Sequence, residues 1–344
     1  MRLEASGGMV LLAASIIALI WANVDSSGYM DFWSTEVSLT IGDWSISEKL
    51  LKVVNDGLMT IFFLVIGLEI KRELTVGELA SRRAAALPAI AAVGGMVLPA
   101  AIYLIATSDG VGAEGWGIPI ATDVAFALAA LAALGRLVPP ALVAFLLGVA
   151  VIDDILAIGV IAIFYTDTIA LGWLAGAIAL VALMLIANRL HIRSMTIYIA
   201  LGLGAWFMTF ESGVHATIAG VVIGLVTPSR PFQHPRTVSA EAIRIAHLAE
   251  DDPDDPDHDA LHWRQLAWLS TEAVSPLARI EHALHRWSSF VILPIFALAN
   301  AGIVLSSDSI EAATENGVAL GIVLGLVIGK TVGITLGALI AVAL

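Results

Sequence analysis

Two adjacent aspartates lie in the middle of a long apolar stretch. The stretch runs from Ala141 to Phe164, and Asp153 and Asp154 are its only charged residues. An ionised carboxylate in an apolar medium costs several kcal/mol unless it is paired, hydrated or protonated. In a helix, consecutive side chains point about 100° apart, so one carboxylate can face a water-filled cavity while the other turns to a neighbouring helix. The pair therefore predicts a site that binds a cation or a proton.

A third aspartate lies in the segment Gly117-Ile118-Pro119-Ile120-Ala121-Thr122-Asp123. Glycine and proline before a polar pair predict an interrupted helix, whose freed backbone groups must line a cavity or contact other parts of the protein. A carboxylate at such a break can offset the positive end of a half-helix. We therefore expect Thr122 and Asp123 to belong to an ion-binding site.

One cation, Lys330, lies near the middle of another apolar stretch, 317–343. The glycines of this stretch recur every four residues, at positions 321, 325, 329, 333 and 337. Such a stripe of small residues lets another helix approach closely and would press the lysine against it. We expect Lys330 to form an ion pair with a buried carboxylate; the alternative is a side chain that extends to the membrane surface.

Two further groups of titratable residues allow two interpretations each. The apolar stretch 50–70 is followed by charges of mixed sign, and the cluster Glu69, Arg72 and Glu73 is either an anchored helix end or a functional group of charges. His215 lies in Ser212-Gly213-Val214-His215-Ala216-Thr217. Its type and place favour a packing or helix-capping role over a proton relay.

The composition indicates what positions these residues. Of 344 residues, 59% are hydrophobic and 14% are charged, whereas soluble proteins average about 25% charged residues. Apolar runs of about 18 residues or more are long enough to cross a bilayer as helices. The sequence predicts an all-α polytopic membrane protein whose surroundings are the lipid bilayer. It contains no cysteine, which excludes disulfides and thiolate metal sites, and its net charge of −13 gives no sign of a nucleic-acid partner.

About ten spans are predicted, at residues 8–23, 50–70, 84–107, 117–135, 139–164, 168–187, 195–210, 214–227, 288–304 and 317–343. We interpret the first as a membrane helix and not as a cleaved signal peptide, because its start has no net positive charge. Lysine and arginine concentrate in the loops after the second, fourth, sixth and eighth spans, while the alternate loops are mainly acidic. By the positive-inside rule, both termini are cytoplasmic.

The predicted organisation has three parts. Residues 1–228 contain the first eight helices, and residues 277–344 contain the ninth and tenth. Between them, residues 229–276 are polar and include a run of acidic residues and prolines at 250–259. Dense like charge with proline cannot bury a core, so we expect an acidic, disordered cytoplasmic loop.

Several of these segments resemble one known family. ATDVAFALAALAALGR, FLLGVAVIDDILAIGVIAIFYT, SGVHATIAG, RIEHALHRW and GLVIGKTVGI are similar, in this order, to the signature segments of NhaA-type Na⁺/H⁺ antiporters. The resemblance covers nearly the whole chain except the acidic loop. It implies a bacterial inner-membrane protein, inverted repeats with broken helices, and exchange of Na⁺, and also Li⁺, for external protons under pH control. It implies no cofactor, and it implies a homodimer.

The resemblance also implies roles for individual residues. Asp154 would be the main Na⁺ ligand and proton carrier, and Asp153 would share that role or pair with Lys330. Thr122 and Asp123 would lie where two broken helices cross. A set of residues at the cytoplasmic entrance would belong to pH activation: Glu69, Arg72, Glu73 and Glu281, with His215 as a further candidate for the pH response.

The family usually has two more helices, one of them the second broken helix. This sequence ends at Leu344, so we expect a fragment or a natural short form with an incomplete second repeat.

Three other functions remain as alternatives: a membrane subunit that does not transport, an intramembrane aspartyl protease and a channel. The protease is disfavoured because its two aspartates lie on separate helices, one in a Gly-x-Gly-Asp context that this sequence lacks. A lysine among the carboxylates would obstruct simple cation flow through a channel. Proton movement that depends on sodium would distinguish the antiporter from all three.

Overall fold

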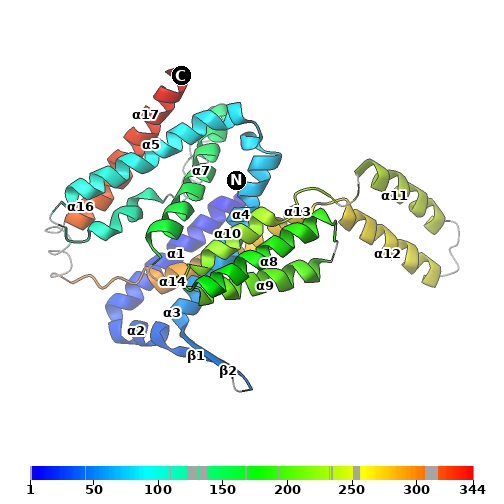
Figure 1. Cartoon of the computed structure of the whole chain (residues 1–344), viewed down its shortest axis with the longest axis horizontal. Helices are drawn as coiled ribbons and strands as arrows, with labels where there is room; N and C mark the ends of the chain where they lie inside the picture. Colours follow the sequence, from blue (N-terminus) through cyan, green and yellow to red (C-terminus); the bar gives the residue numbers. More distant parts are fainter. Residues whose placement is uncertain are drawn as a thin grey trace.

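The structure is a computed structural model in which helices predominate (Figure 1). It describes residues 2–42, 44–108, 110–121, 131, 138–166, 169–192, 194–231, 233, 235–250, 256–306 and 317–343. Within these residues, six helical segments are long and apolar enough to cross a membrane. Four of them are single α-helices: α1 (Arg2–Val24), α5 (Arg82–Ala106), α7 (Pro140–Phe164) and α8 (Leu171–Arg189).

The other two long segments each contain a π-helical turn. The first consists of α3 (Leu50–Lys52), the π-helical η1 (Val53–Leu58) and α4 (Met59–Thr75). The second consists of α16 (Gly317–Leu324), the π-helical η6 (Gly325–Gly329) and α17 (Lys330–Ala343). Such turns occur often at functional sites, and η6 ends directly before Lys330.

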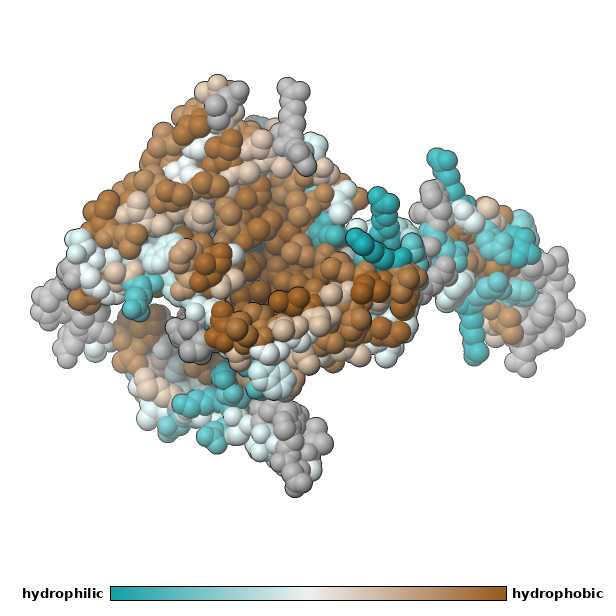
Figure 2. All heavy atoms as spheres, in the orientation of Figure 1, coloured by the Kyte–Doolittle hydropathy of each residue, from teal (hydrophilic) through white to brown (hydrophobic). Residues whose placement is uncertain are grey.

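Two shorter apolar helices, α9 (Met195–Glu211) and α10 (Ala216–Val226), complete eight of the ten predicted spans. Many large apolar side chains of these helices are exposed, such as Ile178 and Ile186 of α8. Figure 2 shows apolar residues over most of the visible face of the body, with hydrophilic residues gathered over α11–α12 and below the body. This distribution is expected of a protein whose solvent is lipid.

The ninth predicted span, 288–304, differs in its bounds. Here α13 (Pro276–Trp287) continues through the π-helical η5 (Ser288–Ile292) into α14 (Leu293–Asn300). The hydroxyl of Tyr29 lies 2.8 Å from the carbonyl oxygen of Leu298 and 2.9 Å from that of Ala299. It thereby satisfies carbonyl groups at the end of the helix, which stops at Asn300, four residues short of the predicted end.

The fourth predicted span, 117–135, lies mostly outside the described residues. Its first residues belong to a 3₁₀ helix, η3 (Ala113–Ile120), and not to an α-helix. Thr122 and Asp123 both lie outside the described residues, so their placement stays a prediction. The described chain reaches them at Ala121, where the backbone is extended.

The glycine stripe of the last span faces α5. A Cβ atom on Gly333 would lie 2.2 Å from the carbonyl oxygen of Gly94, and one on Gly337 would lie 2.6 Å from that of Ile90. The two helices therefore touch through their backbones, as the spacing of the glycines predicts. Figure 1 shows α5 alongside α16 and α17. A similar contact joins α4 to α10, because a Cβ on Gly220 would lie 2.3 Å from the carbonyl oxygen of Thr60.

The loop between the first two spans contains structure that the sequence analysis did not predict. After α2 (Ser26–Ser34), strands β1 (Glu36–Ile41) and β2 (Trp44–Lys49) form an antiparallel hairpin in which Ile41 pairs with Trp44. Gly42 has a φ of 63° at the turn, a conformation that glycine adopts without strain. The alternation of apolar and polar residues before and after Gly42 is the signal for this hairpin.

The expected disorder of residues 229–276 is wrong for most of this segment. It forms two helices, α11 (Pro235–Glu250) and α12 (Pro256–Glu272), which pack on each other around buried Val238, Ile245 and Leu269. Val238 and Ile245 lie seven residues apart on α11, and Leu269 lies three residues after the partly buried Leu266 on α12, so each helix presents an apolar face to a small core of their own. The acidic run at its centre dominated the composition and concealed that pattern. A short 3₁₀ turn, η2 (Glu78–Ala80), completes the described elements.

Candidate functional site

Asp153 and Lys330 form a buried ion pair between α7 and α17. The Nζ atom of Lys330 donates a hydrogen bond to Oδ2 of Asp153 over 2.6 Å. The side chain of Asp153 is 4% exposed and that of Lys330 10% exposed, so both charges are removed from solvent. Each charge offsets much of the other's desolvation cost, which in the interior is several kcal/mol per ion.

The packing of α17 on α5 brings the lysine to this position. A Cβ atom on Gly95 of α5 would lie 3.9 Å from Cδ of Lys330, so the aliphatic part of the lysine passes over a residue without a side chain. A larger residue at position 95 would also meet Ile334, at 2.6 Å. The glycines therefore set the depth at which the ammonium group meets Asp153.

Asp154 follows on the same helix and is half-buried. Because adjacent helical side chains diverge by about 100°, Asp154 points in a different direction from the ion pair. The region thus holds two carboxylates from α7 and one ammonium group from α17. A carboxylate in such a place can be neutralised by a cation or by a proton.

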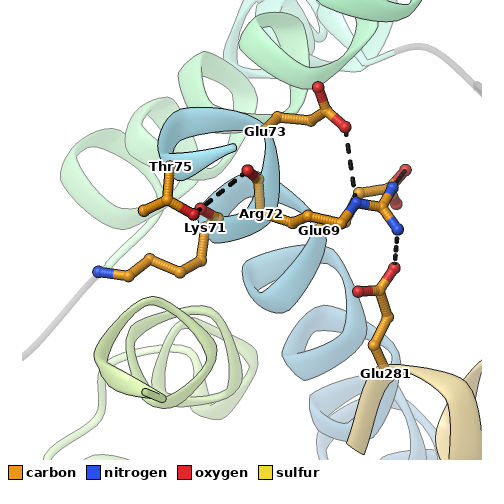
Figure 3. Close-up of polar contacts among 6 residues, drawn as sticks. All are labelled: Glu69, Lys71, Arg72, Glu73, Thr75 and Glu281. Carbon is orange, nitrogen blue, oxygen red and sulfur yellow. Dashed lines mark hydrogen bonds and ion pairs between the residues drawn. The ribbon is translucent and has the colours of Figure 1, made fainter. Parts of the chain in front are cut away.

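A second cluster of charges surrounds Arg72 near the end of α4 (Figure 3). Arg72 contacts three carboxylates: it forms a close hydrogen-bonded ion pair with Glu281 of α13, and lies 3.8 Å from Glu69 and 3.6 Å from Glu73. Figure 3 shows Lys71 pointing away from this group. The structure therefore brings together the four residues Glu69, Arg72, Glu73 and Glu281, which are up to 212 positions apart in the sequence.

His215 does not belong to this cluster. Its Nε2 atom lies 3.0 Å from the carbonyl oxygen of Tyr165, at the end of α7, and His215 directly precedes α10. It also interacts electrostatically with Asp56 in η1. Asp56 and Arg72 are sixteen residues apart, or about 24 Å along a helix. His215 thus lies near the Asp56 end of the η1–α4 segment, whereas Arg72 lies near its other end. His215 contacts the end of α7.

The sequence analysis missed one residue that the structure makes prominent. The Tyr165 hydroxyl accepts a hydrogen bond from the backbone N–H of Gly117 over 2.8 Å and donates one to the carbonyl oxygen of Glu114 over 2.6 Å. A tyrosine at the end of an apolar span is usually an interfacial anchor, so its type and position alone do not indicate this role.

Apolar helices around a buried Asp–Lys pair, with another carboxylate beside it, define a polytopic membrane protein that handles small ions. Comparison with known proteins gives the family. The sequence profile of the family described as Na⁺/H⁺ antiporter 1 matches residues 1–344. The chain belongs to this family, whose members are transporters and not enzymes.

Individual relatives agree with this assignment. The protein named Na(+)/H(+) antiporter NhaA of Oleidesulfovibrio alaskensis is 45% identical over 323 residues, which cover 91% of this chain and 71% of the relative. The protein of the same name from Janthinobacterium sp. (strain Marseille) is 43% identical over 326 residues, covering 93% and 72%. Na(+)/H(+) antiporter NhaA 2 of Myxococcus xanthus is 43% identical over 319 residues, covering 91% and 68%.

Proposed function

We propose that this chain exchanges Na⁺ for protons across the bacterial inner membrane and extrudes Na⁺ at the expense of external protons. One observation carries the proposal: Asp154 lies on a membrane-spanning helix directly beside a buried Asp153–Lys330 ion pair. Carboxylates inside a bilayer are costly and are characteristic of ion and proton pathways. Family membership supports the choice of Na⁺ and H⁺ as the transported ions.

In this proposal one carboxylate site serves both ions. Asp154 is the main Na⁺ ligand and proton carrier, because a carboxylate oxygen binds a hard cation and also takes up a proton. Either ion removes the same negative charge, so the two compete and never need to be bound together. Alternating exposure of the site to the two sides of the membrane then couples Na⁺ efflux to proton entry. No cofactor is required, since both ions are cargo.

Asp153 has a different part because Lys330 already neutralises it. Protonation of Asp153 would remove the Coulomb attraction that holds the ammonium group in place. Asp153 therefore either shares ion binding with Asp154 or links the charge of the site to the contact between α7 and α17. Thr122 and Asp123 complete the proposed site, with Asp123 offsetting the positive ends of broken helices.

The cluster around Arg72 is our candidate for pH control. Its ion pair between Arg72 and Glu281 links α4 to α13, so proton uptake by Glu281 would weaken this link between the two helices. His215, directly before the start of α10, is a second candidate. We also propose Li⁺ as an alternative substrate, since its chemistry with oxygen ligands is similar.

The finer topology is also part of the proposal. Ten spans, inverted repeats and cytoplasmic termini follow from the loop charges and from the family resemblance. A homodimer is supported by the resemblance and by the β1–β2 hairpin, since a two-stranded sheet has edges that can pair with a second copy.

Transport by the purified chain in liposomes would test the function. A pH-sensitive dye inside the vesicles should report proton movement when NaCl is added and little when KCl is added. A channel would be revealed by strong dependence on a potassium ionophore that clamps the voltage. Cleavage of a membrane peptide would support the protease alternative, and the absence of any ion movement would support the non-transporting subunit.

A further inference from the structure

The 3₁₀ helix η3 is held by two tyrosines from different helices. The hydroxyl of Tyr165, at the end of α7, bridges the N–H of Gly117 and the carbonyl oxygen of Glu114. The hydroxyl of Tyr103, in α5, donates to the carbonyl oxygen of Gly112 over 2.6 Å. A 3₁₀ segment at membrane depth has backbone groups that need partners, and these hydroxyls supply them.

The contact with Tyr165 is also closely fitted. A Cβ atom on Gly117 would lie 2.7 Å from the Tyr165 hydroxyl oxygen and 2.9 Å from its ring, so only glycine allows this approach. The ring of Tyr165 also packs in a tilted arrangement against the ring of Trp116, with the centroids 6.2 Å apart. The ring packing and the hydroxyl bonds are therefore separable, because a phenylalanine would keep the first and lose the second.

On its other side η3 meets the segment that leads to Lys330. A Cβ atom on Gly325 would lie 2.9 Å from Cβ of Pro119. Gly325 begins the π-helical turn η6, whose last residue directly precedes Lys330. The short helix η3 thus contacts both the helix that carries Asp153 and Asp154 and the π-helical turn that directly precedes Lys330.

The chain leaves η3 at Ala121, the residue before Thr122. Whatever fixes η3 therefore fixes where the chain enters the segment with Thr122 and Asp123. Tyr165 lies eleven residues after Asp154, about 17 Å along α7, so it does not itself reach an ion held at Asp154. Its influence on the ion must act through the position of η3.

We propose that Tyr165 is a positioning residue for ion exchange, whose hydroxyl locks η3 against α7 and so sets the geometry at which the chain enters the ion site. This inference rests on the proposed function. It assigns the hydroxyl two consequences: tight Na⁺ binding depends on it, and it keeps the buried end of η3, at Ile120, closed to solvent. Ile120 is 1% exposed.

Tyr165→Phe tests the first consequence. We expect the apparent KM for Na⁺ to rise about tenfold or more, because the substitution removes two hydrogen bonds and each corresponds to a several-fold change in an equilibrium constant. The rate at saturating Na⁺ should change far less. Tyr198→Phe is the matched control: its hydroxyl is buried in α9 and has no hydrogen-bond partner among the described residues. An unchanged KM, or a fall in rate that only follows membrane abundance, would overturn the proposal.

Thiol labelling tests the second consequence without relying on transport. The chain has no cysteine, so Ile120→Cys introduces a single reactive group. A membrane-impermeant maleimide should label it several-fold faster when Tyr165→Phe is added, and equally slowly when Tyr198→Phe is added. Equal labelling in both backgrounds would overturn the inference. If the parent chain moves no ions, the proposed function fails, and the labelling result still decides the role of Tyr165.

Discussion

The Nζ atom of Lys330 lies 2.6 Å from Oδ2 of Asp153, and both side chains are buried. Their residues are 177 positions apart and come from helices α17 and α7. A buried ion pair rarely adds much stability over an apolar pair of equal size, whereas removal of one partner is strongly destabilising. The pair is therefore better explained by what its charges do for the neighbouring Asp154.

Asp154→Asn should abolish exchange and leave membrane insertion intact. The amide cannot take up a proton and is a weaker ligand for Na⁺ than a carboxylate. Exchange should fall to the background of empty vesicles, measured as Na⁺-dependent proton movement at equal membrane abundance. Asp154→Glu, which keeps the charge, is the matched comparison and should retain part of the activity. Near-parental exchange in Asp154→Asn would remove Asp154 from the site.

The Asp153–Lys330 pair can be tested with a double-mutant cycle in thermal stability. Lys330→Met leaves Asp153 without its ammonium partner and should cost about 3–5 kcal/mol. Asp153→Asn combined with Lys330→Met should cost clearly less than the single lysine substitution, because no uncompensated charge is then buried. Melting temperatures of the four purified proteins in one detergent give the coupling. Strictly additive effects of the two substitutions would mean that Asp153 and Lys330 have no coupling free energy, which would contradict the ion pair.

Much of the site could be predicted because charges in apolar spans are conspicuous. Asp153, Asp154 and Lys330 stand alone in their stretches, and the glycine spacing indicated the close helix contact that seats the lysine. The partner of Lys330 was harder to fix, since Asp153 and Asp154 differ only in the direction in which they leave α7. That direction depends on helix rotation, which packing against α5 and α17 determines.

Gly333→Ala should separate α5 from α17. The new Cβ atom would lie 2.2 Å from the carbonyl oxygen of Gly94, which is backbone and cannot rotate away. Overpacking of this kind costs about 1–3 kcal/mol and would shift Lys330 relative to Asp153. We expect a lower melting temperature and a higher apparent KM for Na⁺. Gly172→Ala in α8 is the control, because no atom lies within 4 Å of its new Cβ and alanine favours helices.

Arg72→Gln should move the pH dependence of exchange. Without the guanidinium group, Glu69, Glu73 and Glu281 lose their shared cation and repel one another, and proton binding relieves this repulsion. We therefore expect half-maximal exchange at a more alkaline pH than in the parent. Arg244→Gln is the control, since Arg244 pairs with the exposed Glu241 on the same helix, α11. Superimposable pH profiles would exclude this cluster from pH control.

The elements outside the membrane were predicted least well, for a physical reason. The spans are surrounded by lipid, so long apolar runs identify them in the sequence. In the loops, by contrast, only a few residues determine the structure. Val238, Ile245 and Leu269 are enough to join α11 and α12, and they lie on either side of the acidic run that dominated our prediction. Likewise, the Tyr165 hydroxyl makes its contact to η3 as a single group, and a single contact leaves no repeating pattern in the sequence that could predict it.

The α11–α12 hairpin should be dispensable for exchange. Its two ends meet at the membrane body, where the N–H of Leu277 donates to the carbonyl oxygen of Pro228 over 3.1 Å. Figure 1 shows the hairpin standing away from the helices that carry Asp153 and Lys330. Its small core is its own, so removing it takes no apolar residue from the transmembrane helices' contacts with one another.

Two nested deletions test this. The first replaces only the acidic run 250–259 by a short glycine–serine linker, and the second replaces residues 230–274. We expect both variants to insert into the membrane and to exchange Na⁺ with a KM within about twofold of the parent. A twofold change corresponds to about 0.4 kcal/mol, and we expect the segment to contribute less than this to Na⁺ binding. If the first deletion is silent while the second abolishes exchange in a well-expressed protein, the helices themselves act on transport. If the first already abolishes it, the acidic run takes part in transport and our assignment of it as a separate solvated segment is wrong.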